Sequence, residues 1–105
     1  MSESPPELPD DLVEQLLALI DRLCDETRTF LDQPGDQQAW YNRGYANGMV
    51  KALQGLVRLD RLDGRDLDDA GEIGTHMALP WGKAYRHGES MGCRETHEIT
   101  GSSLT

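Results

Sequence analysis

Apolar residues recur every three or four positions between residues 10 and 33, and this spacing restricts the fold more than any other feature of the chain. They form two adjacent stripes, which at about 100° per residue merge into one arc of roughly 160°. The two stripes are Leu12, Leu16, Leu19, Leu23 and Phe30, and Val13, Leu17, Ile20, Cys24 and Leu31. The pattern predicts an amphipathic helix over about 10–33, which Pro34 and Gly35 end because proline cannot continue the hydrogen-bond ladder.

A second helix, antiparallel to the first, is predicted over about 37–60. Asp36 is a favourable N-cap residue for its start. Gly44, Gly48 and Ala52 recur every four residues, and each glycine inside a helix costs about 1 kcal/mol relative to alanine. We expect the close approach of a neighbouring helix to offset this cost, because small side chains let two backbones come together.

The apolar arc of the second helix spans roughly 200°, which is more than one neighbouring helix can cover. Either the last third of the chain folds back over the hairpin, or a second copy packs onto it. We expect one mainly α domain, with a flexible leader at 1–8, a helical hairpin at 9–63 and an irregular C-terminal segment at 64–105. A short strand is expected near 94–99. The expected assembly is a homodimer that resembles a four-helix bundle, and a monomer with its tail folded back is the alternative.

The chain is strongly acidic, with 19 Asp and Glu against 10 Lys and Arg and a formal net charge of −9 over 105 residues. Aspartate outnumbers glutamate, and the only lysines are Lys51 and Lys83. A surface rich in aspartate and poor in lysine keeps a protein soluble in concentrated salt, which indicates a halophilic protein. A GC-rich genome, which favours arginine codons over lysine codons, is the alternative explanation.

Several functional classes are disfavoured by what the sequence lacks. No apolar run approaches the roughly 18 residues of a membrane span, and the first residues lack the basic and apolar regions of a secretory signal. Two cysteines are too few for a disulfide scaffold. These observations predict a cytoplasmic protein with no membrane partner. No phosphate loop, GxSxG or HExxH motif occurs, so a non-enzymatic role is favoured, and an enzyme would have to use the histidines and Cys93.

Trp40 is predicted on the polar side of the second helix, beside Arg43 and Lys51. A tryptophan in that position is either covered by another segment, such as Trp81 or Tyr85, or anchors an interface, because Trp, Tyr and Arg dominate binding hot spots. The sequence therefore predicts an interaction module that dimerises, or binds a partner protein, through its hairpin. The expected interface residues are Trp40, Tyr41, Gly44, Tyr45, Gly48, Met49, Ala52 and Leu56.

Three cations follow one another along the second helix, at Arg43, Lys51 and Arg58, with Trp40 nearby. A basic and aromatic surface of this kind can bind single-stranded nucleic acid. Binding to phosphates weakens steeply with salt, and the chain as a whole carries a charge of −9. Nucleic acid is therefore not an expected partner.

A possible metal site lies in the C-terminal third of the chain. His87, Cys93 and His97 form the pattern H-x5-C-x3-H, with His76 eleven residues upstream of His87. Imidazole and thiolate are zinc ligands, so zinc binding in this segment is the alternative function. The spacing matches none of the compact zinc signatures, and scattered surface histidines with an incidental cysteine would explain it equally well.

The salt dependence of folding tests the halophilic interpretation. If the acidic composition reflects adaptation to salt, lowering the salt from molar to about 0.1 M increases the repulsion between carboxylates. We expect the helical circular dichroism signal and the melting temperature to fall. A melting temperature that does not depend on salt would assign the composition to codon usage instead.

Overall fold

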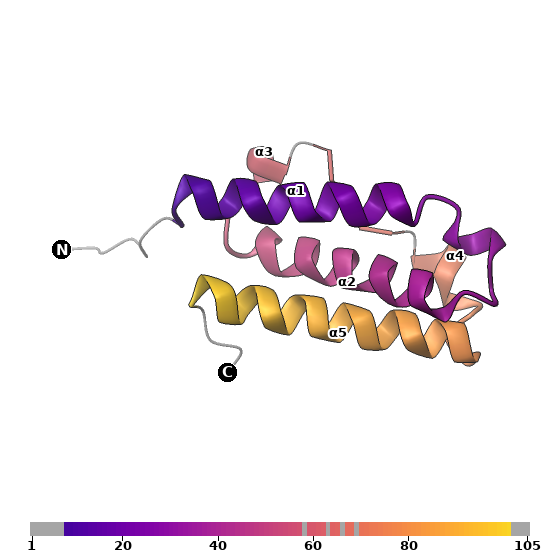
Figure 1. The fold of residues 1–105 in the computed structure, drawn as a ribbon. Coiled ribbons are helices and arrows are strands. Elements are labelled where there is room, and N and C mark those ends of the chain that lie inside the picture. The colour runs from indigo at the N-terminus through magenta and orange to yellow at the C-terminus, as the bar shows by residue number, and fades with distance from the viewer. Residues whose placement is uncertain (1–7, 58, 63, 66, 69, 102–105) are drawn as a thin grey trace.

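Three long helices lie side by side in one layer of the computed structural model, with α2 (Gln37–Gln54) between α1 (Asp10–Glu26) and α5 (Pro80–Thr100) (Figure 1). α1 runs antiparallel to α2, whereas α5 runs parallel to it. The shorter elements are the 3-10 helix Phe30–Asp32, α3 (Leu59–Leu62) and α4 (Ala70–Gly74). The structure describes residues 8–57, 59–62, 64–65, 67–68 and 70–101, and no strand occurs within these ranges. The predicted leader at 1–8 lies outside them except for its last residue.

α1 ends earlier than predicted, at Glu26 rather than near residue 33. Thr27 follows it, and its backbone N–H and its hydroxyl both donate to the carbonyl of Leu23, the hydroxyl at 2.6 Å. The chain then turns, and Phe30 packs edge-on against Trp40 with 4.8 Å between the ring centroids. Phe30 therefore leaves the stripe predicted for the first helix because it is buried in a separate aromatic core.

α2 begins where predicted, and the expected cap is confirmed, because the Asp36 carboxylate accepts a hydrogen bond from the N–H of Ala39 at 3.0 Å. The helix ends at Gln54 rather than near residue 60, with Gly55 at its C-cap. α3 then starts a new helical turn, and Leu62 reaches the core.

The expectation of an irregular tail is wrong for residues 80–100, and the strand expected near 94–99 is also wrong. This stretch is α5, which begins with Pro80 in its first turn and ends at Gly101 in the left-handed conformation, with φ of 77°. Its several glycines lower its intrinsic helix propensity. Its local sequence therefore favours a helix only weakly, and packing against α2 stabilises it.

Four glycines, two on each helix, bring the backbones of α2 and α5 into direct contact. A side chain at any of them would collide with a backbone carbonyl of the other helix. The contacts are Gly44 with Tyr85, Gly48 with Glu89, Gly88 with Tyr41, and Gly92 with Tyr45. The close approach predicted at Gly44 and Gly48 is confirmed, and the neighbouring helix belongs to the same chain.

Two apolar cores stabilise this arrangement. The first lies between α1 and α2 and is sealed by α3; its buried members are Val13, Leu16, Leu17, Ile20, Met49, Val50, Leu53 and Leu62. The second is mainly aromatic and joins the α1–α2 turn to α4 and α5; its buried members are Phe30, Trp40, Ile73 and Tyr85. α2 therefore contributes buried residues to both cores, although its apolar pattern is less regular than that of α1.

The segment between α2 and α5 covers one face of the three-helix layer. In Figure 1 it passes behind α1. Arg61 pairs with Asp10 at 3.0 Å, and Arg65 pairs with Asp21 at 2.7 Å, so two ion pairs attach the segment to α1. No part of the described chain crosses the opposite face. The two faces of the layer therefore differ, one being covered and the other open.

The glycine contacts predict a large effect of a single methyl group at position 48. Gly48→Ala should lower the free energy of unfolding by about 1–3 kcal/mol, because the new Cβ meets backbone atoms of α5, which cannot move aside as a flexible side chain would. Urea unfolding measures the change. The matched control is Gly35→Ala, whose Cβ would meet no atom within 4 Å. Equal free energies of unfolding for the two variants would contradict the packing role of Gly48.

Candidate functional site

Most of the residues predicted to form an interface are buried within a single chain. The buried ones are Trp40, Gly44, Gly48, Met49 and Ala52. Three others, Tyr41, Tyr45 and Leu56, stay partly exposed. α5 of the same chain covers Gly44 and Gly48 and is the second neighbouring helix that the wide apolar arc of α2 requires. Any surface for a partner must therefore be sought among the partly exposed residues.

Trp40 has no exposed surface. Its indole Nε1 donates to the carbonyl of Gln33 at 3.1 Å. Its ring lies 4.8 Å from Phe30, 5.0 Å from His76 and 6.5 Å from Tyr85, measured between centroids. These three rings explain how a tryptophan beside polar residues of α2 is shielded from water.

α1 carries a row of leucines on the side away from the covering segment. At about 100° per residue they lie roughly 140–180° around the helix from Asp10 and Asp21, which pair with that segment. Leu12, Leu19 and Leu23 are partly exposed and pack against the first core, and Tyr45 of α2, also partly exposed, packs against the same core. Helical geometry places these leucines in one narrow stripe, because positions i, i+7 and i+11 nearly coincide around a helix. We call the four residues Leu12, Leu19, Leu23 and Tyr45 the leucine–tyrosine face.

Tyr45 is held in this face by α5. Its hydroxyl donates to the Glu95 carboxylate at 2.5 Å. Burial, together with this hydrogen bond and the charge of Glu95, raises the pKa of Tyr45. The hydroxyl therefore keeps its proton, and the ring has a fixed position beside the leucine row.

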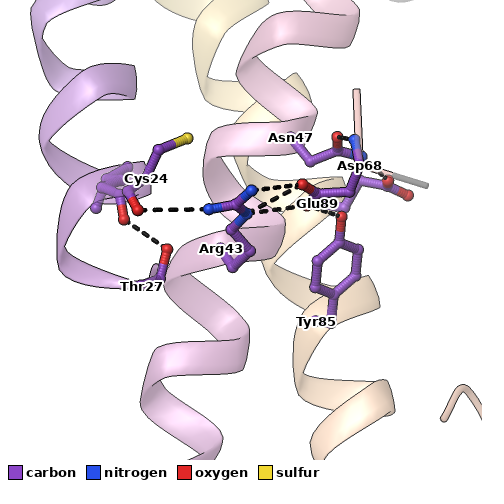
Figure 2. A network of polar contacts seen from close by, with 8 residues as sticks. Cys24, Thr27, Arg43, Asn47, Asp68, Tyr85 and Glu89 are labelled. Atoms are coloured by element: carbon purple, nitrogen blue, oxygen red, sulfur yellow. Dashed lines mark hydrogen bonds and ion pairs between the residues drawn. The ribbon is translucent and has the colours of Figure 1, made fainter. Parts of the chain in front are cut away.

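A polar network centred on Asp68 lies on the covered side of the layer (Figure 2). Arg43 donates from Nε and Nη2 to the Asp68 carboxylate at 2.8–3.2 Å, and the Tyr85 hydroxyl donates to it at 2.6 Å. The backbone N–H of Asp68 donates to the Asn47 side chain at 2.8 Å. The Asp68 side chain is 12% exposed and that of Arg43 22%. The network therefore joins α2, α5 and the covering segment in a partly dry environment.

The same contacts account for part of the basic stripe predicted along α2. Arg43 is paired with Asp68, and Lys51 lies 3.5 Å from the Glu89 carboxylate. Glu89 also accepts a hydrogen bond from Asn47 at 2.6 Å. The third cation, Arg58, lies outside the described residues. Two of the three cations are thus paired within the chain.

The protonation states in the network follow from burial and from Asp68. Burial and the hydrogen bond to Asp68 raise the pKa of Tyr85, which stays neutral. Burial alone would lower the pKa of Arg43, but the hydrogen bonds and the charge of Asp68 outweigh it and raise the pKa. Every buried polar side-chain atom in the described ranges has a hydrogen-bond partner. The network therefore has no buried polar side-chain atom without a partner among the described residues, and it acts first as a cross-link between segments.

No sequence signal distinguishes the central residue of this network. Asp68 is one of several acids between residues 60 and 72, and 25 residues separate it from Arg43. Asp68 meets Arg43 because of the way the covering segment folds over the helices. A local sequence pattern does not predict that course.

The four predicted metal ligands do not converge. His76 precedes α5, and its Nδ1 accepts a hydrogen bond from the Trp81 indole at 3.0 Å. His87 is exposed on α5, whereas Cys93 and His97 are partly buried one turn apart on the same helix. Within the described part of the chain, no group of three or more His, Cys, Asp and Glu side chains is arranged to hold a metal ion.

Comparison of the chain with models of protein families, with curated proteins and with solved structures finds no match. None of the described helices combines the length and the apolar character that a membrane-spanning helix needs. Any functional interpretation therefore depends on the chemistry and the exposure of the residues themselves.

The hydrogen bond between Tyr85 and Asp68 predicts a stability difference that depends on pH. Tyr85→Phe should lower the free energy of unfolding by about 1.5–3 kcal/mol at neutral pH, because a buried carboxylate loses a donor. The raised pKa means that folded Tyr85 keeps its proton above the ordinary value of 10.0, where the unfolded chain loses it. The Tyr85 hydroxyl therefore contributes fully to the free energy of unfolding below about pH 10. Above that pH, the difference in free energy of unfolding between the wild type and Tyr85→Phe should narrow by about 1.4 kcal/mol per pH unit.

Urea unfolding of the wild type and of Tyr85→Phe at a series of pH values measures this difference. Tyr41→Phe, on the partly exposed side of α2, is the matched control and should show little change at neutral pH. A difference between wild type and Tyr85→Phe that stays constant across the alkaline range would contradict the assigned hydrogen bond.

Proposed function

We propose that this protein is a non-enzymatic interaction module that associates with a second copy of itself through the leucine–tyrosine face. The observation that carries the proposal is the row Leu12, Leu19 and Leu23, which stays partly exposed. It lies on the side of α1 away from Asp10 and Asp21, the residues that pair with the covering segment. Apolar side chains in a contiguous row gain stability when a partner removes them from water.

The spacing of the leucines favours a second copy over an unrelated partner. Together with buried Leu16, the row runs Leu12, Leu16, Leu19, Leu23, with intervals of four, three and four residues. This is the spacing of the a and d positions of a coiled coil, in which like helices interlock their leucines. A two-fold axis would bring the same patch of both copies together, and two α1–α2 pairs would then form a four-helix arrangement.

The charges beside the row are compatible with such self-association. Arg22 and Glu26 lie three residues after Leu19 and Leu23, on the same side of α1, and Arg22 donates to Glu26 at 3.0 Å. The border of the face therefore carries both signs of charge, although the chain as a whole is acidic. Exposed ion pairs of this kind contribute little affinity. A border that carries both charges nevertheless avoids uniform electrostatic repulsion between two copies.

Light scattering tests the proposal. The wild type should have twice the chain mass of 11.7 kDa, and Leu19→Lys should return the mass to that of one chain. Lysine retains an aliphatic stem that can cover the core while its charge stays in water, so circular dichroism of the variant should remain helical. The matched control is Leu67→Lys, because Leu67 is exposed in the segment that covers the other face.

A wild-type mass of one chain at all concentrations would contradict the proposal. The same conclusion would follow if Leu19→Lys remained folded and kept the doubled mass. If Leu67→Lys rather than Leu19→Lys dissociated the protein, the interface would lie on the covering segment.

A further inference from the structure

A cavity of about 260 Å³ lies between α1, α2 and the described residues Gly64, Arg65 and Asp68, on the covered side of the layer. This volume is just below the roughly 300–1,000 Å³ range of small-molecule pockets, so the cavity suits a small ligand. Its apolar wall is formed by Ile20, Ala46 and Val50. Its polar wall is formed by Cys24, Arg43 and Asn47, together with the charged side chains of Asp21, Arg65 and Asp68. The two kinds of wall face one partly open cavity.

The polar end of the cavity has unused hydrogen-bond donors. A guanidinium carries five N–H groups, and Arg43 uses Nε and Nη2 on Asp68 and Nη1 on the carbonyl of Cys24 at 3.4 Å. One N–H on each terminal nitrogen has no acceptor among the described residues. Two such groups on one guanidinium form a fork that matches the two oxygens of a carboxylate.

The neighbouring groups also favour a ligand that accepts hydrogen bonds. The Asp68 oxygens are occupied by Arg43 and Tyr85, and the Asp21 oxygens accept from Arg65 at 2.8 and 2.7 Å. Burial raises the pKa of the Cys24 thiol, which therefore keeps its proton. Figure 2 shows its sulfur directed into the space between α1 and α2 above the Arg43 guanidinium.

We propose that this cavity binds a short aliphatic carboxylate. The carboxylate lies on the free fork of Arg43, and the carbon chain packs against Ile20, Ala46 and Val50. A cationic ligand would meet the Arg43 guanidinium and find the carboxylates already occupied. The site lies on the opposite side of the layer from the leucine–tyrosine face, so it does not depend on self-association.

Titration with isobutyrate, followed by amide NMR at one fixed salt concentration, tests the site. A probe this small should bind with a Kd on the order of 1 mM and shift the amide signals of Cys24, Arg43 and Asn47. Isobutyramide has the same shape without the charge, and it should bind at least about tenfold more weakly. Absence of shifts with isobutyrate, or equal binding of isobutyramide, would overturn the proposal.

Two substitutions distinguish binding of isobutyrate in the cavity from a nonspecific effect of the anion. Ala46→Leu fills the cavity and should weaken isobutyrate binding at least about tenfold, whereas Ala18→Leu, the same change on the exposed side of α1, should leave binding unchanged. Arg43→Lys keeps a cation beside Asp68 but removes the fork, and it should weaken binding similarly. Wild-type binding by folded Ala46→Leu or by folded Arg43→Lys would show that the proposed site is wrong.

Discussion

The backbone contact between α2 and α5 is the interaction on which the rest of the structure depends. Because Gly44 and Gly48 have no side chains, α5 approaches α2 until the backbones of the two helices are in contact. This approach brings Tyr85 and Glu89 within hydrogen-bond distance of groups beside α2. Packing against α2 also stabilises α5 as a helix, because its many glycines give it a low intrinsic helix propensity. Dispersion contacts over such a flat surface are individually small and collectively large.

The two faces of the helical layer have different chemistry as a consequence. On one face, Arg43 and Asp68 anchor the segment between α2 and α5, which forms a partly open cavity with α1 and α2. On the other face no described segment covers α1 and α2, and the leucine row keeps part of its surface in water. The covered face thus offers a small cavity with arginine donors, and the open face offers an extended apolar row. These are different kinds of binding surface, and the proposed self-association and the proposed ligand use one each.

Sequence reasoning succeeded where the signal was local. Two helices from near residue 10 and from residue 37 follow from apolar periodicity, and Asp36 caps the second as expected because a capping residue acts within one turn. The ends of the helices were less predictable. α1 stops before Thr27 because Phe30 is drawn into the aromatic core, and α2 stops at Gly55 although apolar residues continue beyond it. Among the candidate site residues, Tyr45 remains partly exposed, whereas Trp40 is buried by rings from three distant parts of the chain.

The sequence by itself determined that this chain forms amphipathic helices, that a neighbouring helix approaches Gly44 and Gly48, and where α2 begins. Each of these properties depends on residues within a few positions of one another. Over that distance helical geometry fixes where each side chain lies around the helix. Only the tertiary structure decided that α5 is the helix that meets those glycines, and that Asp68 pairs with Arg43. These contacts join residues 25 or more positions apart, and their free energy depends on burial that exists only once the whole layer has assembled.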